Sequence, residues 1–188
     1  LPELVQVAEW QNNRTDVHGQ VKTMHTVLTI INDEMKELGN LAPEIYWSVE
    51  NNSLGEAALV VIQEMDEDKF PGTFLHEPKK KGRQRAMRKG FTTTYKTKIT
   101  ACMKMKSWIE SDKMIPLSKT FIRELKTFIA KGKSYEAKTG ETDDLVSATL
   151  LCVRQIQVIS RFEEGYEELL GSTLDTDTDY SDPLPVIF

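Results

Sequence analysis

The chain has 188 residues, of which 39% are hydrophobic and 28% charged, with a formal net charge of −5. These proportions are typical of a soluble globular domain with one core. No apolar run approaches the ~20 residues of a membrane span, no secretory leader opens the chain, and the histidines have no cysteine partners at zinc-site spacing. The composition therefore argues against a membrane-spanning protein, a secreted protein and a zinc site.

Two kinds of apolar periodicity alternate along the chain. A repeat of two predicts strands, and a repeat of three to four predicts helices. The predicted elements are a strand at Leu4–Gln11, a helix at His18–Leu38, a strand at Glu44–Glu50, a helix from about Glu56 to Met65, a strand at Thr73–His76, a helix at Thr97–Asp112, a strand at Met114–Leu117, a helix capped by Ser118 that runs to Lys131, a connection or short strand at Lys133–Lys138, and a helix that ends near Phe162 with further turns expected to Leu170. This order predicts an α/β fold in which helices flank a central mixed sheet.

Apolar helical faces and strands also predict which sulfur and indole groups are buried. Cys102 and Cys152 lie on apolar helical faces, so we expect two buried thiols and no disulfide. Trp10, Trp47 and Trp108 lie in apolar periodic segments, so we expect them in the core.

Two adjacent acids, Asp143 and Asp144, stand at the start of the last predicted helix. Thr142 is the expected N-cap, which puts both carboxylates in the first turn, where exposed amides and the helix dipole favour negative charge. A good N-terminal cap is a sufficient explanation of the pair by itself. A functional site becomes the better explanation only if another carboxylate meets it.

Glu50 ends the second predicted strand and is the candidate partner. Taken alone, it is equally well explained as a cap of the next turn. Open α/β sheets, however, gather their chemistry at the carboxyl ends of strands and at adjacent helix N-termini. Carboxylates at that edge suit a two-metal site of Mg²⁺ or Mn²⁺ that acts on a phosphodiester. Glu50, Asp143 and Asp144 are therefore the candidate catalytic and metal-binding residues.

A basic block occupies the middle of the chain, with nine cations and no acid. It has few large apolar residues, which predicts an exposed loop of about twenty residues. One explanation is a solvated loop that only aids solubility. The other is DNA binding, because phosphate contacts need cations concentrated in one segment and do not need a positive net charge over the whole chain. The candidate DNA-binding residues are Lys79, Lys80, Lys81, Arg83, Arg85, Arg88, Lys89, Lys96 and Lys98.

Five segments in register resemble the nuclease domain of tailed-bacteriophage large terminase subunits. They are the strand-end glutamate motif Val49–Gly55, the basic Thr-Lys segment Thr94–Lys98, the run Trp108–Ile115, the segment Lys131–Ala137 and the acidic segment Asp143–Val146. The resemblance runs from about Leu4 to Phe162, and the Tyr180–Phe188 end is similar to the tail of members from contractile-tailed phages.

The resemblance implies an RNase H-like domain over residues 1–170, followed by an acidic tail over residues 171–188. It implies a metal-dependent endonuclease that cuts concatemeric double-stranded DNA during headful packaging in the host cytoplasm. In this family an ATPase motor domain precedes the nuclease, and portal and small terminase subunits are partners. Glu50 matches the second catalytic acid, Asp144 the last one, and Asp143 a neighbouring acid.

One departure from the family pattern concerns the first catalytic aspartate. In the family it lies on a strand before the one predicted at Leu4–Gln11, and Glu9 and Asp16 are the only nearby acids here. Neither lies in the expected motif. We therefore expect the 188 residues to be a fragment with an incomplete metal site and weak or no nuclease activity alone.

Two other functions fit parts of the pattern. In a nonenzymatic DNA-binding or assembly module, the acids would only cap helices. Another RNase H-like nuclease, such as a resolvase or an integrase, would use similar acids, although the long basic block and the order of motifs disfavour it. The acidic tail is expected to be disordered, with DNA mimicry as the alternative.

Overall fold

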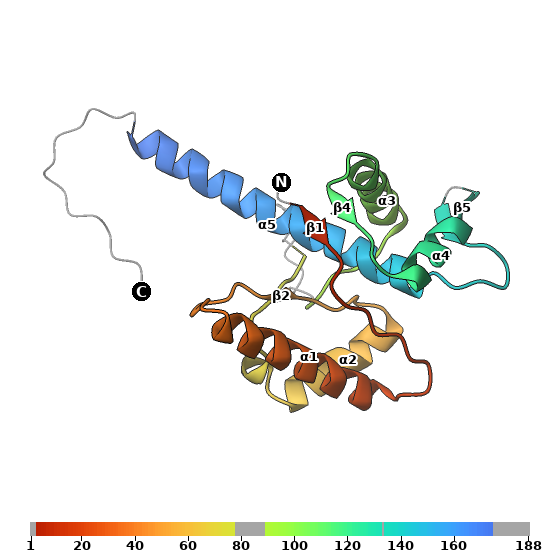
Figure 1. Ribbon diagram of the computed structural model, residues 1–188, viewed down its shortest axis with the longest axis horizontal. Coiled ribbons are helices and arrows are strands. Elements are labelled where there is room, and N and C mark those ends of the chain that lie inside the picture. Colours follow the sequence, from red (N-terminus) through yellow and green to blue (C-terminus); the bar gives the residue numbers. More distant parts are fainter. Residues whose placement is uncertain (1–2, 78–88, 133, 175–188) are drawn as a thin grey trace, which may run out of the picture.

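The computed structural model describes residues 3–77, 89–132 and 134–174, and in helix α5 it describes side chains as far as residue 160. The elements are β1 (Leu4–Val5), α1 (Val17–Glu37), β2 (Tyr46–Trp47), α2 (Ser53–Glu64), a 3₁₀ turn (Glu67–Lys69), β3 (Thr73–Phe74), α3 (Tyr95–Glu110), β4 (Met114–Ile115), α4 (Lys119–Thr127), β5 (Phe128–Lys131), β6 (Ser134–Ala137) and α5 (Asp144–Leu174) (Figure 1). The mixture of helix and strand is compatible with the α/β prediction. None of the helices in the described ranges is both long and apolar enough to cross a membrane.

The described strands pair two by two. β1 pairs with β4 and β2 pairs with β3, both in parallel, and β5 pairs with β6 in antiparallel. The single central sheet predicted from the sequence is therefore not formed by the described residues, which contain three two-stranded sheets. A backbone bridge from Glu50 to Phe91 extends the β2 side of the molecule toward the start of α3.

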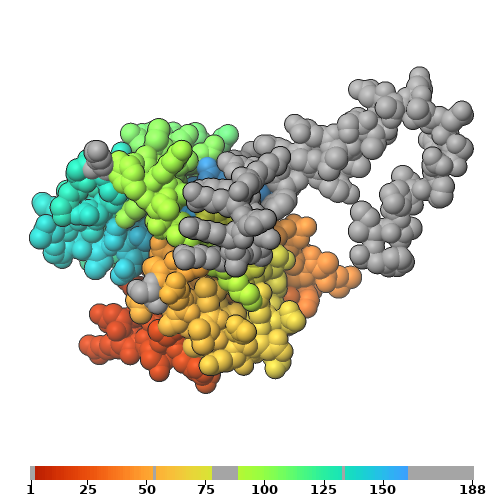
Figure 2. All heavy atoms as spheres, turned by 180° about the vertical axis from the view of Figure 1, so that it is seen from behind, coloured from red at the N-terminus to blue at the C-terminus, as the bar shows by residue number. Residues whose placement is uncertain are grey.

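Two apolar clusters divide the molecule into two packed halves. The first half packs α1 and α2 around Trp47 and Phe74 of the β2–β3 pair. The second packs α3, α4 and the first half of α5 around Phe121 and Val146. Figure 2 shows the red-to-orange atoms of the first half on one side and the green-to-cyan atoms of the second on the other. A smaller cluster of Leu75, Phe91 and Val158 joins them along α5.

Most predicted helices are confirmed to within a few residues, because polar caps mark their ends. Asp16 accepts a hydrogen bond from Gly19 N at the start of α1, and Gly39, with φ of 94°, follows its end. Thr94 and Thr97 form a capping box at the start of α3. The last helix reaches Leu174, so the turns expected beyond Phe162 are present. Residues 175–188, which hold most of the predicted tail, lie outside the described ranges.

The predicted end of the α4 helix is wrong. The helix stops at Thr127, and Phe128–Lys131 instead pairs with Ser134–Ala137 as a hairpin. Apolar residues at helical spacing continue through this stretch, which is why the sequence pattern favours a helix. Gly132, with φ of 60°, sits in the hairpin turn, where the left-handed conformation reverses the chain.

The predicted strand at Leu4–Gln11 is also mostly wrong. Only Leu4 and Val5 pair with β4, Val7 is 86% exposed and Trp10 is 47% exposed, so Trp10 is not a core residue. Trp47 and Trp108 are buried, as predicted. The partner strand ends at Ile115, before Pro116, which has no N–H to extend the ladder.

The two cysteines are free, which confirms the prediction of no disulfide within the chain. Cys102 is buried in α3, and this burial raises the pKa of its thiol. Cys152 is exposed on α5, so the prediction of a second buried thiol is wrong.

Candidate active site

Glu50 lies where the chain leaves the β2 segment and turns into α2. Its backbone bridges Phe91, and the flanking hydrogen bonds are Asn51 N to Phe91 O at 2.7 Å and Phe91 N to Val49 O at 3.0 Å. The carboxylate accepts from Asn52 Nδ2 at 2.9 Å. The cap of α2 is Asn52, which accepts from Gly55 N at 2.9 Å. The alternative that Glu50 itself caps the next turn is therefore wrong, and its carboxylate is half-buried at the junction of the two halves.

Gly55 is required by the close approach of α2 to the backbone of Glu50. A Cβ added at residue 55 would lie 1.6 Å from the Glu50 carbonyl oxygen. We expect Gly55→Ala to lower the free energy of unfolding by about 2–3 kcal/mol, because the strand end must move. Gly39→Ala is the control: φ is +94° there but nothing lies within 4 Å, so we expect about 1 kcal/mol. Urea denaturation checks both values, and equal losses would contradict the prediction.

Asp143 and Asp144 stand at the N-terminus of α5, as predicted, but the cap differs from the prediction. Asp143 O accepts the first helical hydrogen bond, from Ser147 N at 2.8 Å, and the helix begins at Asp144. Thr142 is therefore not the N-cap. Its hydroxyl donates to Glu124 Oε1 at 3.1 Å instead.

Glu124 of α4 caps α5 from another element and was missed by the sequence reasoning. Glu124 is 3% exposed, and its carboxylate accepts from the backbone N–H groups of Leu145, at 2.8 Å, and Val146, at 3.2 Å. Gln11 Nε2 also donates to it, at 3.3 Å, and reaches Asp144 Oδ2 at 3.0 Å. A signal exists in the sequence: Glu124 is a charged residue on the otherwise apolar face of its helix.

Lys98 of α3 links the strand end to the helix N-terminus. Its Nζ lies 3.5 Å from Asp143 Oδ2, and it lines the same pocket of about 60 Å³ as Glu50. Arg154 of α5 and the hydroxyl-bearing Thr93 and Ser147 also line this pocket. Lys98 thus pairs with Asp143 and shares a pocket with Glu50, although these two acids are 93 positions apart in the sequence.

The candidate metal-binding residues do not form a metal site as they stand. In the described ranges, no group of three or more His, Cys, Asp or Glu side chains could hold a metal ion. Glu50 and Asp143 offer the hard oxygen donors that Mg²⁺ prefers. However, Lys98 pairs with Asp143, and Asp144 accepts from the Gln11 amide. The three-carboxylate arrangement predicted from the sequence is therefore only partly brought together.

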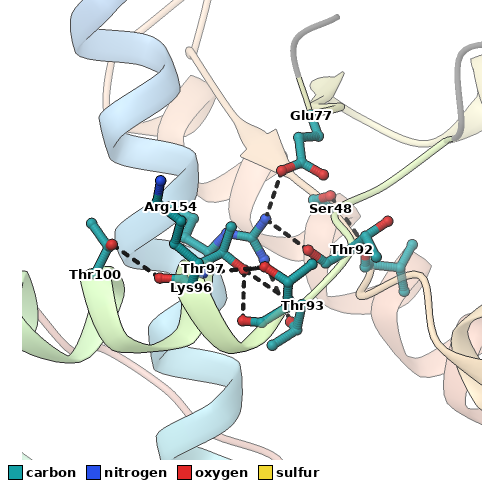
Figure 3. Close-up of polar contacts among 10 residues, drawn as sticks. Ser48, Glu77, Thr92, Thr93, Lys96, Thr97, Thr100 and Arg154 are labelled. Atoms are coloured by element: carbon teal, nitrogen blue, oxygen red, sulfur yellow. Dashed lines mark hydrogen bonds and ion pairs between the residues drawn. The ribbon is translucent and has the colours of Figure 1, made fainter. Parts of the chain in front are cut away.

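Arg154 is a buried cation that ties α5 to Glu77, which precedes the basic block, and to Thr92 within it (Figure 3). It donates to Glu77 Oε1 at 3.2 Å and to Thr92 O at 3.1 Å, and its guanidinium lies over the Phe91 ring. Burial lowers the pKa of the Arg154 guanidinium, whereas the carboxylates of Glu77 and Glu50 act to raise it. This network holds the segment after Gly90 against α5.

His76 contacts the segment after the basic residues 79–88 through its ring nitrogen Nδ1. This nitrogen can accept a hydrogen bond only when the imidazole is neutral. Its Nδ1 accepts from Gly90 N at 3.1 Å. Burial lowers the pKa of His76 from its ordinary 6.5, with Glu67 raising it and Lys89 lowering it. The unfolded chain therefore binds a proton more readily, so this contribution to stability is complete above pH 6.5 and is lost as the pH falls toward the folded-state pKa.

We expect this linkage to appear as a pH-dependent difference between variants. Between about pH 7.5 and about pH 5.5, wild type should lose more stability than His76→Gln, which has no proton to gain. His18→Gln, at an exposed histidine of α1, is the control and should behave as wild type. Urea denaturation at both pH values is the measurement, and an equal loss in wild type and His76→Gln would contradict the prediction.

Three of the nine candidate DNA-binding residues fall in the described ranges. Lys89 pairs with Glu67, Lys98 pairs with Asp143, and Lys96 is exposed at the start of α3. The hydroxyl of Thr93 accepts from Arg154 Nη1 at 3.4 Å, and Thr94 caps α3. The other six residues lie outside the described ranges: Lys79, Lys80, Lys81, Arg83, Arg85 and Arg88.

Comparison of the sequence with protein-family models gave no match.

Proposed function

We propose that this chain is the endonuclease domain of a viral DNA-packaging terminase, which hydrolyses phosphodiester bonds of double-stranded DNA with Mg²⁺ or Mn²⁺. The observation that carries the proposal is that Lys98 pairs with Asp143 and lines one pocket with Glu50 where the two halves of the molecule join. Lys98 thus connects the segment that carries Glu50 with the helix N-terminus that carries Asp143, two segments distant in the sequence. The family resemblance supplies the substrate and the biological setting.

We propose an RNase H-like fold for the domain. Among the described residues, two of the three strand pairs are parallel, and parallel pairs ordinarily belong to larger sheets buried on both faces. The upstream strand that the resemblance implies would provide such a larger sheet and would carry the first catalytic aspartate. The family resemblance is also the reason for proposing the ATPase motor, the portal and the small terminase subunit as partners.

In the proposed reaction, the chain's own residues have distinct tasks. The carboxylates of Glu50, Asp143 and Asp144 provide the negative charge of the site, and divalent ions, when bound, would stabilise charge that develops at the phosphate. Exposed cations such as Lys96 would attract the DNA backbone without reading bases. Arg154 would hold Glu77 and Thr92, on the two sides of residues 78–88, beside the pocket that Glu50 lines.

The test is cleavage of supercoiled plasmid in the presence of Mg²⁺, Mn²⁺ or chelator. It compares the 188-residue chain with an extended chain, which adds upstream residues from the same reading frame. We expect metal-dependent cutting by the extended chain and weak or no cutting by the 188 residues. DNA binding without cleavage by the extended chain, at any metal concentration, would instead favour the nonenzymatic DNA-binding module.

A further inference from the structure

An apolar groove lies between α3, the end of α4 and the β5–β6 hairpin. Its volume is about 410 Å³, within the range of about 300–1,000 Å³ that is typical of binding clefts. The apolar residues that line it are Met103, Met105 and Ile109 of α3, Leu125 of α4, and Phe128 and Tyr135 of the hairpin. Met103 is 66% exposed, so this apolar surface is open to water. Such a surface favours an apolar partner, and methionine side chains are frequent where a binding surface must adapt.

The elements that form the groove are basic. Together α3, α4, β5 and β6 hold eight Lys and Arg residues and three acids. All three acids are engaged, because Glu124 caps α5 while Glu110 and Glu136 each pair with a lysine of the same elements. The surroundings of the groove therefore attract a segment that carries negative charge.

The acidic tail has the matching composition. Residues 175–188 contain four aspartates and no base, and the apolar run Leu-Pro-Val-Ile-Phe occupies 184–188. Pro185 fixes its own φ and disfavours helix at the residue before it, so an extended backbone is expected in this run. Alternate side chains of an extended segment point to the same side, which would let Leu184, Val186 and Phe188 enter the groove together.

The tail is long enough to reach the groove of its own chain. Met105 belongs to the same apolar cluster as Val146 and Leu150, so α3 packs beside the first half of α5. From Asp144 to Leu174, α5 is about 46 Å long, and residues 175–188 can span at most about 46–50 Å. A segment tethered by a short linker has an effective concentration of the order of millimolar, so even a weak affinity would hold it in place.

We propose that residues 184–188 bind in this groove of their own chain, with the preceding aspartates beside the basic residues of α3 and α4. The apolar run covers wall residues such as Met103 that otherwise face water. The aspartates offset part of the positive charge of this half of the molecule. The inference stands on the groove and on the composition of the tail, and it does not depend on the proposed nuclease function.

The experiment follows isotope-labelled methionine methyl groups by NMR in the full 188-residue chain. Met103 and Met105 report on the groove, and Met24 of α1 reports on the other half of the molecule. The tail variant combines Val186→Asp with Phe188→Ser, which makes the apolar run polar without shortening the chain. We expect the signals of Met103 and Met105 to shift in this variant and the signal of Met24 to stay in place.

Two controls test whether the shift comes from the groove. Thr178→Ala, in the tail but outside the apolar run, should leave all three signals unchanged. Met103→Glu puts an acid on the groove wall and should already release the tail, so adding the tail substitutions to it should no longer shift the Met105 signal. Val60→Glu, at a 57% exposed residue of α2, is the matched variant in which the tail substitutions should still shift that signal.

The remaining outcomes would overturn the proposal. Unchanged Met103 and Met105 signals in the tail variant would show that the apolar run does not bind in the groove. A shift that grows with protein concentration in wild type would mean that the tail of a second copy fills the groove, and not the tail of the same chain. An equal loss of the Met105 shift in the Met103→Glu and Val60→Glu backgrounds would show that the groove is not the binding site.

Discussion

Glu50→Gln is expected to lower plasmid cleavage by the extended chain at least about a hundredfold. The substitution removes the negative charge while keeping the size of the side chain and an oxygen for Asn52 Nδ2, which now lies 2.9 Å away. The backbone bridge to Phe91 does not involve the side chain, so the strand end should stay in place. The effect should therefore appear in the chemical step and not in folding.

The matched control for Glu50 is Glu44, an exposed acid at the other end of the same predicted strand. Glu44→Gln should cut plasmid as wild type does, and Asp144→Asn should lose activity as Glu50→Gln does. Each variant is also tested for DNA binding by gel shift, where all three should resemble wild type. Cleavage by Glu50→Gln within about threefold of wild type would show that this carboxylate takes no part in the reaction.

Glu124→Ala is expected to lower the free energy of unfolding by about 3 kcal/mol, although Glu124 lies outside the predicted site. Glu124 is 3% exposed, and its carboxylate is the acceptor for two buried N–H groups at the start of α5. Without it, the N–H groups of Leu145 and Val146 lose their acceptor and remain buried. Urea denaturation followed by circular dichroism measures the loss.

Two further variants test whether capping is the reason. Glu124→Gln keeps one acceptor oxygen but turns an NH₂ group toward the same donors, so we expect a loss of about 2 kcal/mol. Glu141→Gln is the control, because Glu141 is exposed just before the helix and should change stability by less than about 0.5 kcal/mol. A loss of under about 1 kcal/mol for Glu124→Ala would mean that water or another group replaces the cap.

Short-range signals explain which parts of the fold were predictable. The start of α3 at Thr94 and the end of α1 before Gly39 follow from caps that neighbouring residues provide. The end of α4 was not predictable in this way, because Phe128 and Ile129 fit a helical repeat as well as a strand. Their pairing with Ala137 and Glu136 decides between the two, and that pairing is a tertiary contact.

In the candidate site too, some features follow from neighbouring residues and others depend on tertiary contacts. The sequence by itself determined that Glu50 ends a strand segment and that Asp143 and Asp144 begin a helix, because such positions depend on local periodicity and capping. Only the tertiary structure decided that Lys98 stands beside Asp143 and that Glu124 caps α5. These contacts join residues 45 and 21 positions apart, and their geometry depends on how α3 and α4 pack against α5. The apolar pattern of α4 singles out Glu124 as a charged residue on an apolar face, but it does not identify the distant groups that Glu124 contacts.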